Sequence, residues 1–457
     1  MNKNNFNKVL AGEKVSFSEY LGYFSYGFGQ CLSFGVVGTF LLIYYTDVFK
    51  ISAIAASGIF FIARVWDAIN DPLIASMMDE RHKEGTDKFK PFLKLLPVFI
   101  SLSTILLFVN VNFSYNLKVI YALITYILWG MLYTVSDISF WSISTVISND
   151  SQERTKLITT ANIGVFGGIG LAGALLPMFR TKLEQIFNFN PTYQNFWGVF
   201  LMMIILIPLC IYGGFTAKER VKIKTTEKVT FRKIFEAVKI NKPLRIILVV
   251  YFLNIFMNIV QGMAPFFFKW NMNREDLFQF YSILSVCSAL GFLILPILTK
   301  NFKKLVILKV LLAIDIILRS IFYFVGYSSP IFVVTMMGIL FFIYALTAPI
   351  LSVMIAETVE YAEYKTGIRT EAVTFSGQTF SGKLSVALAG TFSGLILSAI
   401  NYNPELSTQS TETLSWFFII IVLLPALGSL FRLIVLHFHT YDELEHEKIL
   451  KLLKNKN

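Results

Sequence analysis

The stretch Arg64-Val-Trp-Asp-Ala-Ile-Asn-Asp-Pro72 places charged side chains inside a hydrophobic segment that is long enough to be a membrane helix. Asp67 and Asp71 are four residues apart and Arg64 precedes Asp67 by three, so on a helix all three side chains lie on one face. A carboxylate near the centre of a bilayer costs roughly 2.5–3.5 kcal/mol, so such groups usually face a bundle interior or an ion path. Two acids with Asn70 between them therefore indicate an ion-binding face. A structural Arg–Asp ion pair is the alternative.

The rest of the chain is too apolar for a soluble domain. Its 457 residues are 55% hydrophobic and 15% charged, with a mean hydropathy of +0.63. Twelve long apolar runs lie between Leu21 and Phe438. Continuous runs of this length favour helices over the short alternating strands of a membrane barrel. We predict an all-α membrane protein with twelve transmembrane helices in two six-helix bundles.

A polar, basic interruption in the middle of the chain defines the expected domains. We predict an N-terminal six-helix bundle at 1–215, a cytoplasmic linker loop at 216–244, a C-terminal six-helix bundle at 245–438 and a cytoplasmic tail at 439–457. Most Lys and Arg residues fall at the termini and in alternate loops, so the positive-inside rule predicts a multi-pass cell-membrane protein with both termini in the cytoplasm. The tail is expected to form a short amphipathic helix on the membrane surface or to be solvated.

Several other function classes are excluded. The net charge of +11 is explained by membrane topology, so we expect no nucleic-acid partner. Cys31, Cys210 and Cys287 are widely separated and offer no metal-ligand spacing or disulfide framework. The four histidines form no Ser-His-Asp or metal-ligand pattern, so we predict no enzyme activity and no cofactor.

The fourth predicted span carries a third buried acid. Asp137 lies three residues after Thr134 and four before Trp141, so a hydroxyl, a carboxylate and an indole share one helix face. Sodium prefers hard oxygen ligands, which Asp67, Asn70, Asp71 and Thr134 supply if spans two and four meet. A proton can use the same acids. Trp141 can cover the apolar side of a sugar ring, with lipid anchoring as its alternative role.

Two further spans contain charged residues. Lys383, in the eleventh predicted span with Gln378 and Thr379, needs a carboxylate partner, and the acids of spans two and four are its natural candidates. Asp315 and Arg319 are four residues apart in the ninth span. We expect these two side chains to pair within their own helix in a structural role.

Four motifs in a fixed order carry a family resemblance. They are Phe61–Pro72, Lys88–Phe92, Ile127–Trp141 and Glu360–Glu371. Together they resemble the glycoside–pentoside–hexuronide:cation symporters, the melibiose-permease group of the major facilitator superfamily. The likeness extends from about Leu21 to the end of the twelfth span and implies the major facilitator fold.

The resemblance implies roles for individual residues. The coupling cation would bind Asp67, Asn70, Asp71 and Thr134, with Asp137 shared between cation and sugar. Lys383 would neutralise these acids. The implied sugar site consists of Tyr133, Asp137, Trp141, Asn162, Gln378, Thr379 and Lys383. The implied cytoplasmic gate consists of Arg154, Glu357, Glu360, Glu363 and Arg369, for which solvated loop charges are the alternative.

The sugar half of the implied site departs from the family pattern. Cys31 stands where melibiose permease has a sugar-binding acid, and Gln30 replaces the preceding Lys. Asn162 stands in place of an Arg and Ala348 in place of an aromatic residue. We therefore expect a substrate other than melibiose.

The predicted function is symport of a sugar or glycoside with Na⁺ or H⁺ by alternating access. We expect the protein to work as a monomer in membrane lipid. If sodium is the coupling ion, it is expected to bind at Asp67 and Asp71. A sodium-dependent transporter of another solute such as a lysolipid, and a non-transporting sensor of the same fold, are the alternatives.

Overall fold

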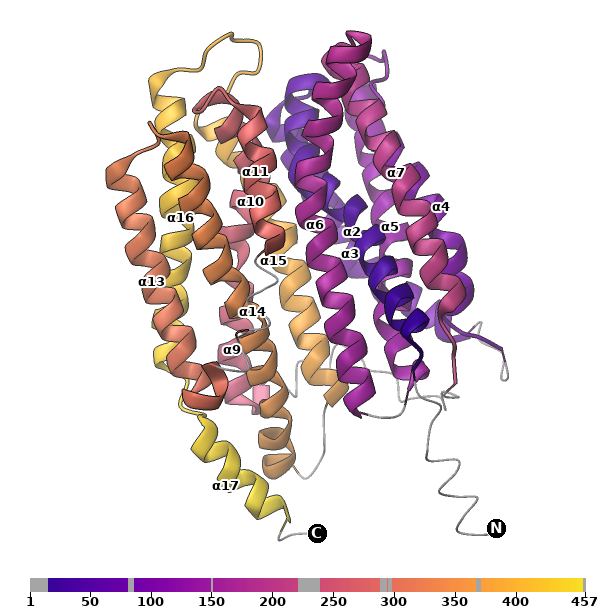
Figure 1. The fold of residues 1–457 in the computed structure, drawn as a ribbon, viewed down its shortest axis with the longest axis vertical. Coiled ribbons are helices and arrows are strands. Elements are labelled where there is room, and N and C mark those ends of the chain that lie inside the picture. Colours follow the sequence, from indigo (N-terminus) through magenta and orange to yellow (C-terminus); the bar gives the residue numbers. More distant parts are fainter. Residues whose placement is uncertain are drawn as a thin grey trace. The chain divides into compact units, whose positions relative to one another are not determined.

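The fold was analysed in a computed structural model that describes residues 15–80, 86–148, 151–220, 239–287, 294, 298–366 and 371–454. Every regular element in these ranges is helical (Figure 1). The side chains of Asp71, Arg154 and Thr379 lie outside the described part, as does all of Arg369. The chain divides into two compact units, Met1–Thr226 and Glu227–Asn457, and each is described by itself.

Six long helices lie in the described part of the first unit. They are α2 (Phe17–Ile43), which continues into the π-helix η1 (Tyr44–Val48), α3 (Ala53–Glu80), α4 (Lys90–Leu107), α5 (Tyr115–Ile147), α6 (Ser151–Phe187) and α7 (Pro191–Thr216). Helix α2 packs against α6 and α7, whereas α3 packs against α5. Helix α4 packs against α5 and α7. The pairing of α3 with α5 brings the second and fourth predicted spans together.

Glycines allow α2 and α6 to approach closely. A Cβ added at Gly164 or Gly168 of α6 would collide with the backbone carbonyl of Phe24 or Phe28 on α2. Small residues at such crossings are typical of membrane helices. In lipid there is no hydrophobic driving force between helices, so they associate through close packing. The start of α2 is also fixed, since Arg220 donates from Nη1 to the buried Glu19 Oε1 at 2.6 Å. These contacts hold the middle of α2 in place for the site described below.

The second unit contains an interrupted helix and a docked tail. Its helices are α9 (Lys242–Phe252), α10 (Ile255–Trp270), α11 (Glu275–Cys287), α13 (Lys304–Val325), α14 (Pro330–Thr366), α15 (Glu371–Ala399), α16 (Thr411–His437) and α17 (Glu443–Lys454). Leu253 and Asn254 separate α9 from α10. Helix α16 packs against α10 and α13, and α17 packs against α14.

The apolar lengths of these helices fit a multi-pass membrane protein. Within the described ranges, nine helical segments are long and apolar enough to cross a membrane. Many of their apolar side chains are exposed, as expected for surfaces that face lipid, including Leu117, Ile120 and Ile124 on α5. The all-helical class is confirmed. The number of twelve spans remains a prediction.

Candidate cation and substrate site

Asp67 lies where α3 meets α5. Its Oδ2 accepts a hydrogen bond from Nη1 of Arg64 at 2.8 Å, and Nη2 of Arg64 donates to the Tyr126 hydroxyl of α5 at 2.7 Å. A Cβ built on Gly130 of α5 would lie 3.3 Å from Asp67 Oδ1. The ion pair that the sequence offered as a structural alternative therefore forms. The second oxygen of the same carboxylate faces the backbone of the helix that carries Asp137.

These contacts define the register of α3 against α5. Arg64 meets Tyr126 and Asp67 meets Gly130, so residue numbers rise in the same direction on both helices. One helical turn further along, Asn70 of α3 falls at the level of Thr134 of α5. Asn70 is 7% exposed and Thr134 is 6% exposed. Asp71 belongs to the same turn of α3, but its side chain lies outside the described residues.

Asn70 has a buried polar atom to satisfy. Its Nδ2 makes no hydrogen bond to the described residues. A buried amide in this condition costs free energy unless water or a solute group satisfies it. The described side chains contain no group of three or more His, Cys, Asp or Glu that could hold a metal ion.

Asp137 is held in place by two neutral donors. Gln30 of α2 donates from Nε2 to Asp137 Oδ1 at 3.1 Å, and Trp141 donates from Nε1 to the same oxygen at 3.1 Å. Ser136 donates to Gln30 Oε1 at 2.7 Å, and its own oxygen lies 2.6 Å from the Tyr26 hydroxyl. These contacts, which we call the Asp137 network, orient the carboxylate. Because an amide and an indole carry no charge, they do so without cancelling its charge.

An aromatic wall lies beside the Asp137 network. The Tyr133 ring lies 5.3 Å from the Trp129 ring and 5.4 Å from the Phe34 ring, measured between centroids. The Tyr133 hydroxyl lies 3.8 Å from Cys31 Sγ, and Trp129 donates from Nε1 to Ser33 Oγ at 2.9 Å. Aromatic faces next to a hydrogen-bond acceptor suit a sugar ring, which has apolar C–H faces and hydroxyl edges.

The functional positions of α5 form one stripe along the helix. Tyr126, Gly130, Thr134, Asp137 and Trp141 follow one another at intervals of three or four residues. Gly130, which marks the level of Asp67, and Asp137 are seven residues apart, or about 10 Å along the helix axis. Asp67 and Asp137 therefore sit at different depths, with Thr134 between them.

Two other predicted substrate residues, Asn162 and Gln378, hydrogen-bond to groups outside the Asp137 network. Asn162 donates from Nδ2 to the Ile158 carbonyl of its own helix α6 at 2.9 Å. In the second unit, Gln378 of α15 donates to Ser352 Oγ of α14 at 2.9 Å, and Lys383 of α15 is exposed. The two units are described separately. That Gln378, Thr379 and Lys383 line the same substrate site as Asp137 therefore remains a prediction.

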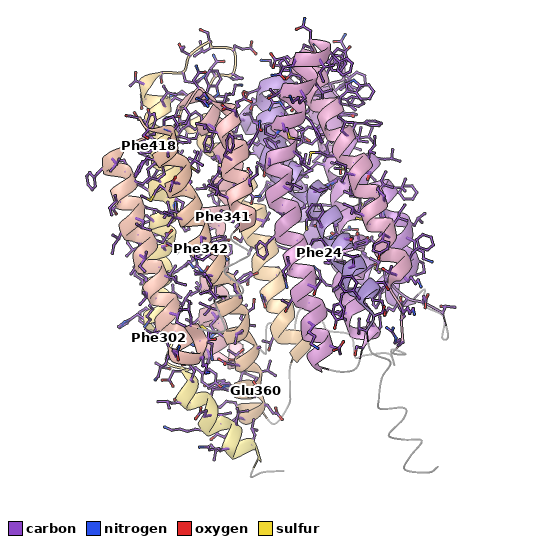
Figure 2. All side chains as sticks on the ribbon, viewed as in Figure 1. Phe24, Phe302, Phe341, Phe342, Glu360 and Phe418 are labelled. Atoms are coloured by element: carbon purple, nitrogen blue, oxygen red, sulfur yellow. The ribbon has the colours of Figure 1, made fainter. Side chains whose placement is uncertain are left out.

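Two predicted gate residues bind the C-terminal tail. Glu357 of α14 pairs with Lys304 Nζ at 2.8 Å and lies 3.8 Å from His446 Nδ1 of α17. His446 Nε2 lies 3.7 Å from Oε2 of Glu360, which is labelled on α14 in Figure 2. Asp442 accepts from Lys303 at 2.8 Å, and this bond holds the pKa of that carboxyl below its usual value.

The tail forms the expected short helix, and this helix packs on α14 of its own unit, so the alternative of a solvated tail is wrong. Its His446 lies next to Glu357 and Glu360, which are expected to act in the gate. A position of this helix on the membrane surface remains a prediction. Glu363 is half-buried on α14. Arg154 and Arg369, the expected basic partners, lie outside the described side chains. Gating by these five residues stays a prediction.

A family model described as MFS/sugar transport protein matches residues 22–443 of this chain. The chain belongs to that family. It is 27% identical to an isoprimeverose transporter of Lactiplantibacillus pentosus over 97% of this chain and 93% of that one. It is 29% identical to a putative glycoside/cation symporter, YagG, of Escherichia coli strain K12 over 84% of each chain. The predicted family is thus confirmed, and its members are transporters, not enzymes.

Solved structures agree on the fold. A crystal structure of a mutant of the nucleoside transporter NupG matches with a TM-score of 0.66 at 12% identity, over 93% of this chain and 100% of that one. At this level of identity the match establishes the major facilitator fold alone.

Gly130 offers a test of the Asp67 carboxylate that changes no charge. In Gly130→Ala, the new methyl group would lie 3.3 Å from Asp67 Oδ1, so the carboxylate must shift by a few tenths of an ångström. We expect the cation concentration for half-maximal uptake to rise about tenfold. The control is Gly58→Ala on α3, where an added Cβ meets nothing within 4 Å. Both changes raise helix propensity alike, so equal cation dependence in the two variants would refute this role of Gly130.

His439 makes stability depend on pH. It follows α16, is 3% exposed, and burial lowers its pKa below the usual value of about 6.5. The unfolded chain therefore binds a proton at a higher pH than the folded one, so His439 contributes stability above about pH 6.5 that is lost as the pH falls toward the folded pKa. We expect the unfolding temperature to decrease on going from about pH 7.5 to about pH 5.5, and His439→Leu to flatten this decrease. The exposed His437→Leu should leave the slope unchanged. Identical slopes in wild type and His439→Leu would show that another group is responsible.

Proposed function

We propose that this protein carries a sugar or glycoside across the cell membrane together with Na⁺ or H⁺, with both termini in the cytoplasm. The observation that carries the proposal is the α5 stripe, in which the oriented carboxylate of Asp137 lies beside an aromatic wall and within about two helical turns of the depth of Asp67, Asn70 and Thr134. An aromatic surface and a carboxylate suit a sugar, and oxygen ligands one to two turns away suit a hard cation or a proton. Placing both on one helix gives the two ligands a shared element through which to interact.

Coupling follows from charge. Carboxylates held in a low-dielectric bundle raise the free energy of the empty site, because burial and mutual repulsion both disfavour the charged form. A cation bound at the level of Thr134 offsets this charge and favours the geometry in which Asp137 accepts a sugar hydroxyl. By linkage the sugar strengthens cation binding by the same factor. Alternating access then moves both ligands together.

The residues around Asp137 favour an uncharged cargo. Gln30 is an amide where the family pattern has a Lys, and Cys31 is a thiol where it has an acid. The site therefore offers one carboxylate, two neutral donors and aromatic faces, which match the hydroxyls and C–H faces of a neutral glycoside. The names of the two relatives, one for isoprimeverose and one for a glycoside with a cation, support the same class.

The test is uptake by purified protein in liposomes. Labelled mono- and disaccharides would be offered under an imposed Na⁺ gradient, an imposed H⁺ gradient or neither. We expect at least one glycoside to accumulate only when one of the gradients is present, and unlabelled competitors would then define the sugar. Displacement by lysolipids instead of sugars would identify the other transported class. Lack of accumulation of any solute under either gradient would contradict symport and favour a sensor.

A further inference from the structure

The second unit contains a small cavity with charged residues in its lining, remote in sequence from the proposed site. It lies at the break between α9 and α10 and is lined by residues of α13, α14 and α16 as well. Asn254 at the break, Asp315 and Arg319 of α13, and Arg432 of α16 all line it. The space inside admits about one water-sized particle. A bundle core of this kind ordinarily buries charges only when they are paired.

Asp315 is already fully engaged. Arg319 donates from Nε to both carboxylate oxygens, at 2.9 Å and 3.0 Å, so the pair predicted from the sequence forms. Ser429 adds a third hydrogen bond, from Oγ to Asp315 Oδ2, at 2.7 Å. Asp315 and Arg319 are 5% and 3% exposed. The negative charge of Asp315 is thus compensated by Arg319.

Arg432 is the second positive charge at the cavity, and it makes no hydrogen bond to Asp315 that resembles the one from Arg319. It is 4% exposed, and its Nη2 donates at 3.3 Å to Thr347 Oγ1, a neutral acceptor. Its Nε has no hydrogen-bond partner among the described residues. The described residues that line the cavity therefore contain two guanidinium groups and one carboxylate. One positive charge in excess among buried groups is unfavourable, so a counter-charge in the cavity is favoured.

A second feature favours negative charge at the same place. Asn254 is the residue before α10, and Phe256 and Met257 of the first turn line the cavity. The start of a helix carries partial positive charge and N–H groups that attract anions. Broken helices in transporters place such ends toward anionic groups. The guanidinium of Arg432 and the start of α10 thus meet in one small space.

We propose that this cavity binds a small monovalent inorganic anion, of the size of chloride, between Arg432 and the first turn of α10. The anion balances Arg432 and ties α16 to the interrupted helix, so it stabilises the second unit. The small volume of the cavity favours an anion of this size over a larger one such as gluconate.

The test compares the unfolding temperature of the purified full-length protein in chloride and in gluconate at equal ionic strength. We expect chloride to raise the unfolding temperature of wild type by about 2–4 °C at saturation and to leave Arg432→Met unaffected. The matched control Arg274→Met removes an exposed arginine of the same unit and should keep the wild-type response. Equal unfolding temperatures of wild type in the two salts would overturn the proposal.

A direct measurement covers the case in which Arg432→Met does not fold. Crystals of wild type grown in bromide should show an anomalous-scattering peak within hydrogen-bonding distance of Arg432. A cavity that holds only water at saturating bromide would reject the anion site, whatever the thermal data show.

Discussion

Asp67→Asn should abolish the stimulation of uptake by the coupling-ion gradient in membrane vesicles. The amide keeps the size of the side chain but removes the charge that faces Gly130 and the level of Asn70 and Thr134. We expect the stimulated rate to fall at least about 100-fold, which corresponds to about 2.8 kcal/mol. The measurement is initial uptake with and without the gradient, at equal amounts of protein in the membrane.

Two controls separate this effect from general damage. Asp47→Asn removes an acid at the end of the first predicted span and should leave stimulation close to wild type. Asp67→Asn also removes the charge that pairs with the guanidinium of Arg64. The double variant with Arg64→Gln therefore shows whether transport is blocked by this guanidinium or by loss of the ion ligand. Stimulation that survives in Asp67→Asn, or that Arg64→Gln restores, would remove Asp67 from the cation site.

Asp137→Asn should eliminate substrate exchange even when no ion gradient is applied. Gln30 and Trp141 both donate to Oδ1, so the substituted side chain can keep these bonds while its Oδ2 position becomes a donor. A sugar hydroxyl then meets a donor where it needs an acceptor. We expect exchange of labelled for unlabelled sugar to fall at least about 100-fold, since hydrogen bonds to charged groups contribute about 1.5–3 kcal/mol.

Trp141→Phe is the matched comparison for Asp137. It removes one donor to the carboxylate and keeps both the charge and an aromatic face, so we expect a loss of about tenfold. Equal losses in Trp141→Phe and Asp137→Asn would mean that the Asp137 network only supports the fold. Wild-type exchange in Asp137→Asn would show that the sugar binds elsewhere.

Much of this site could be predicted from spacing within single helices. The positions of Thr134, Asp137 and Trp141 on one face of α5 follow from helical periodicity, and so does the Asp315–Arg319 pair. The Arg64–Asp67 ion pair was predicted as the alternative to an ion-binding face, and this pair forms in the structure. In each case the interaction joins residues three or four apart, for which sequence distance and spatial distance agree.

Contacts between different helices could not be predicted from spacing within a single helix. Gln30 is 107 residues from Asp137 and appears in the sequence only as a departure from the family pattern. Its contact with Asp137 depends on how closely α2 packs against the glycines of α6. Helical periodicity does not specify this packing. The closeness of Gly130 to Asp67 depends likewise on the register of α3 against α5. The docking of α17 depends on the ion pairs of Asp442 with Lys303 and of Glu443 with Lys304, and on packing against α14. The amphipathic pattern of the tail allowed a helix but did not identify these partners.

If cation and sugar bind to one coupled site on α3 and α5, each should strengthen the binding of the other. Calorimetric titration of purified protein with the transported sugar, with and without Na⁺ and at two pH values, measures this coupling directly. We expect one of the two cations to raise the sugar affinity, the sugar to raise the affinity for that cation by the same factor, and Asp67→Asn to lose the effect. Sugar affinity that is independent of both Na⁺ and pH in wild type would contradict the coupled site.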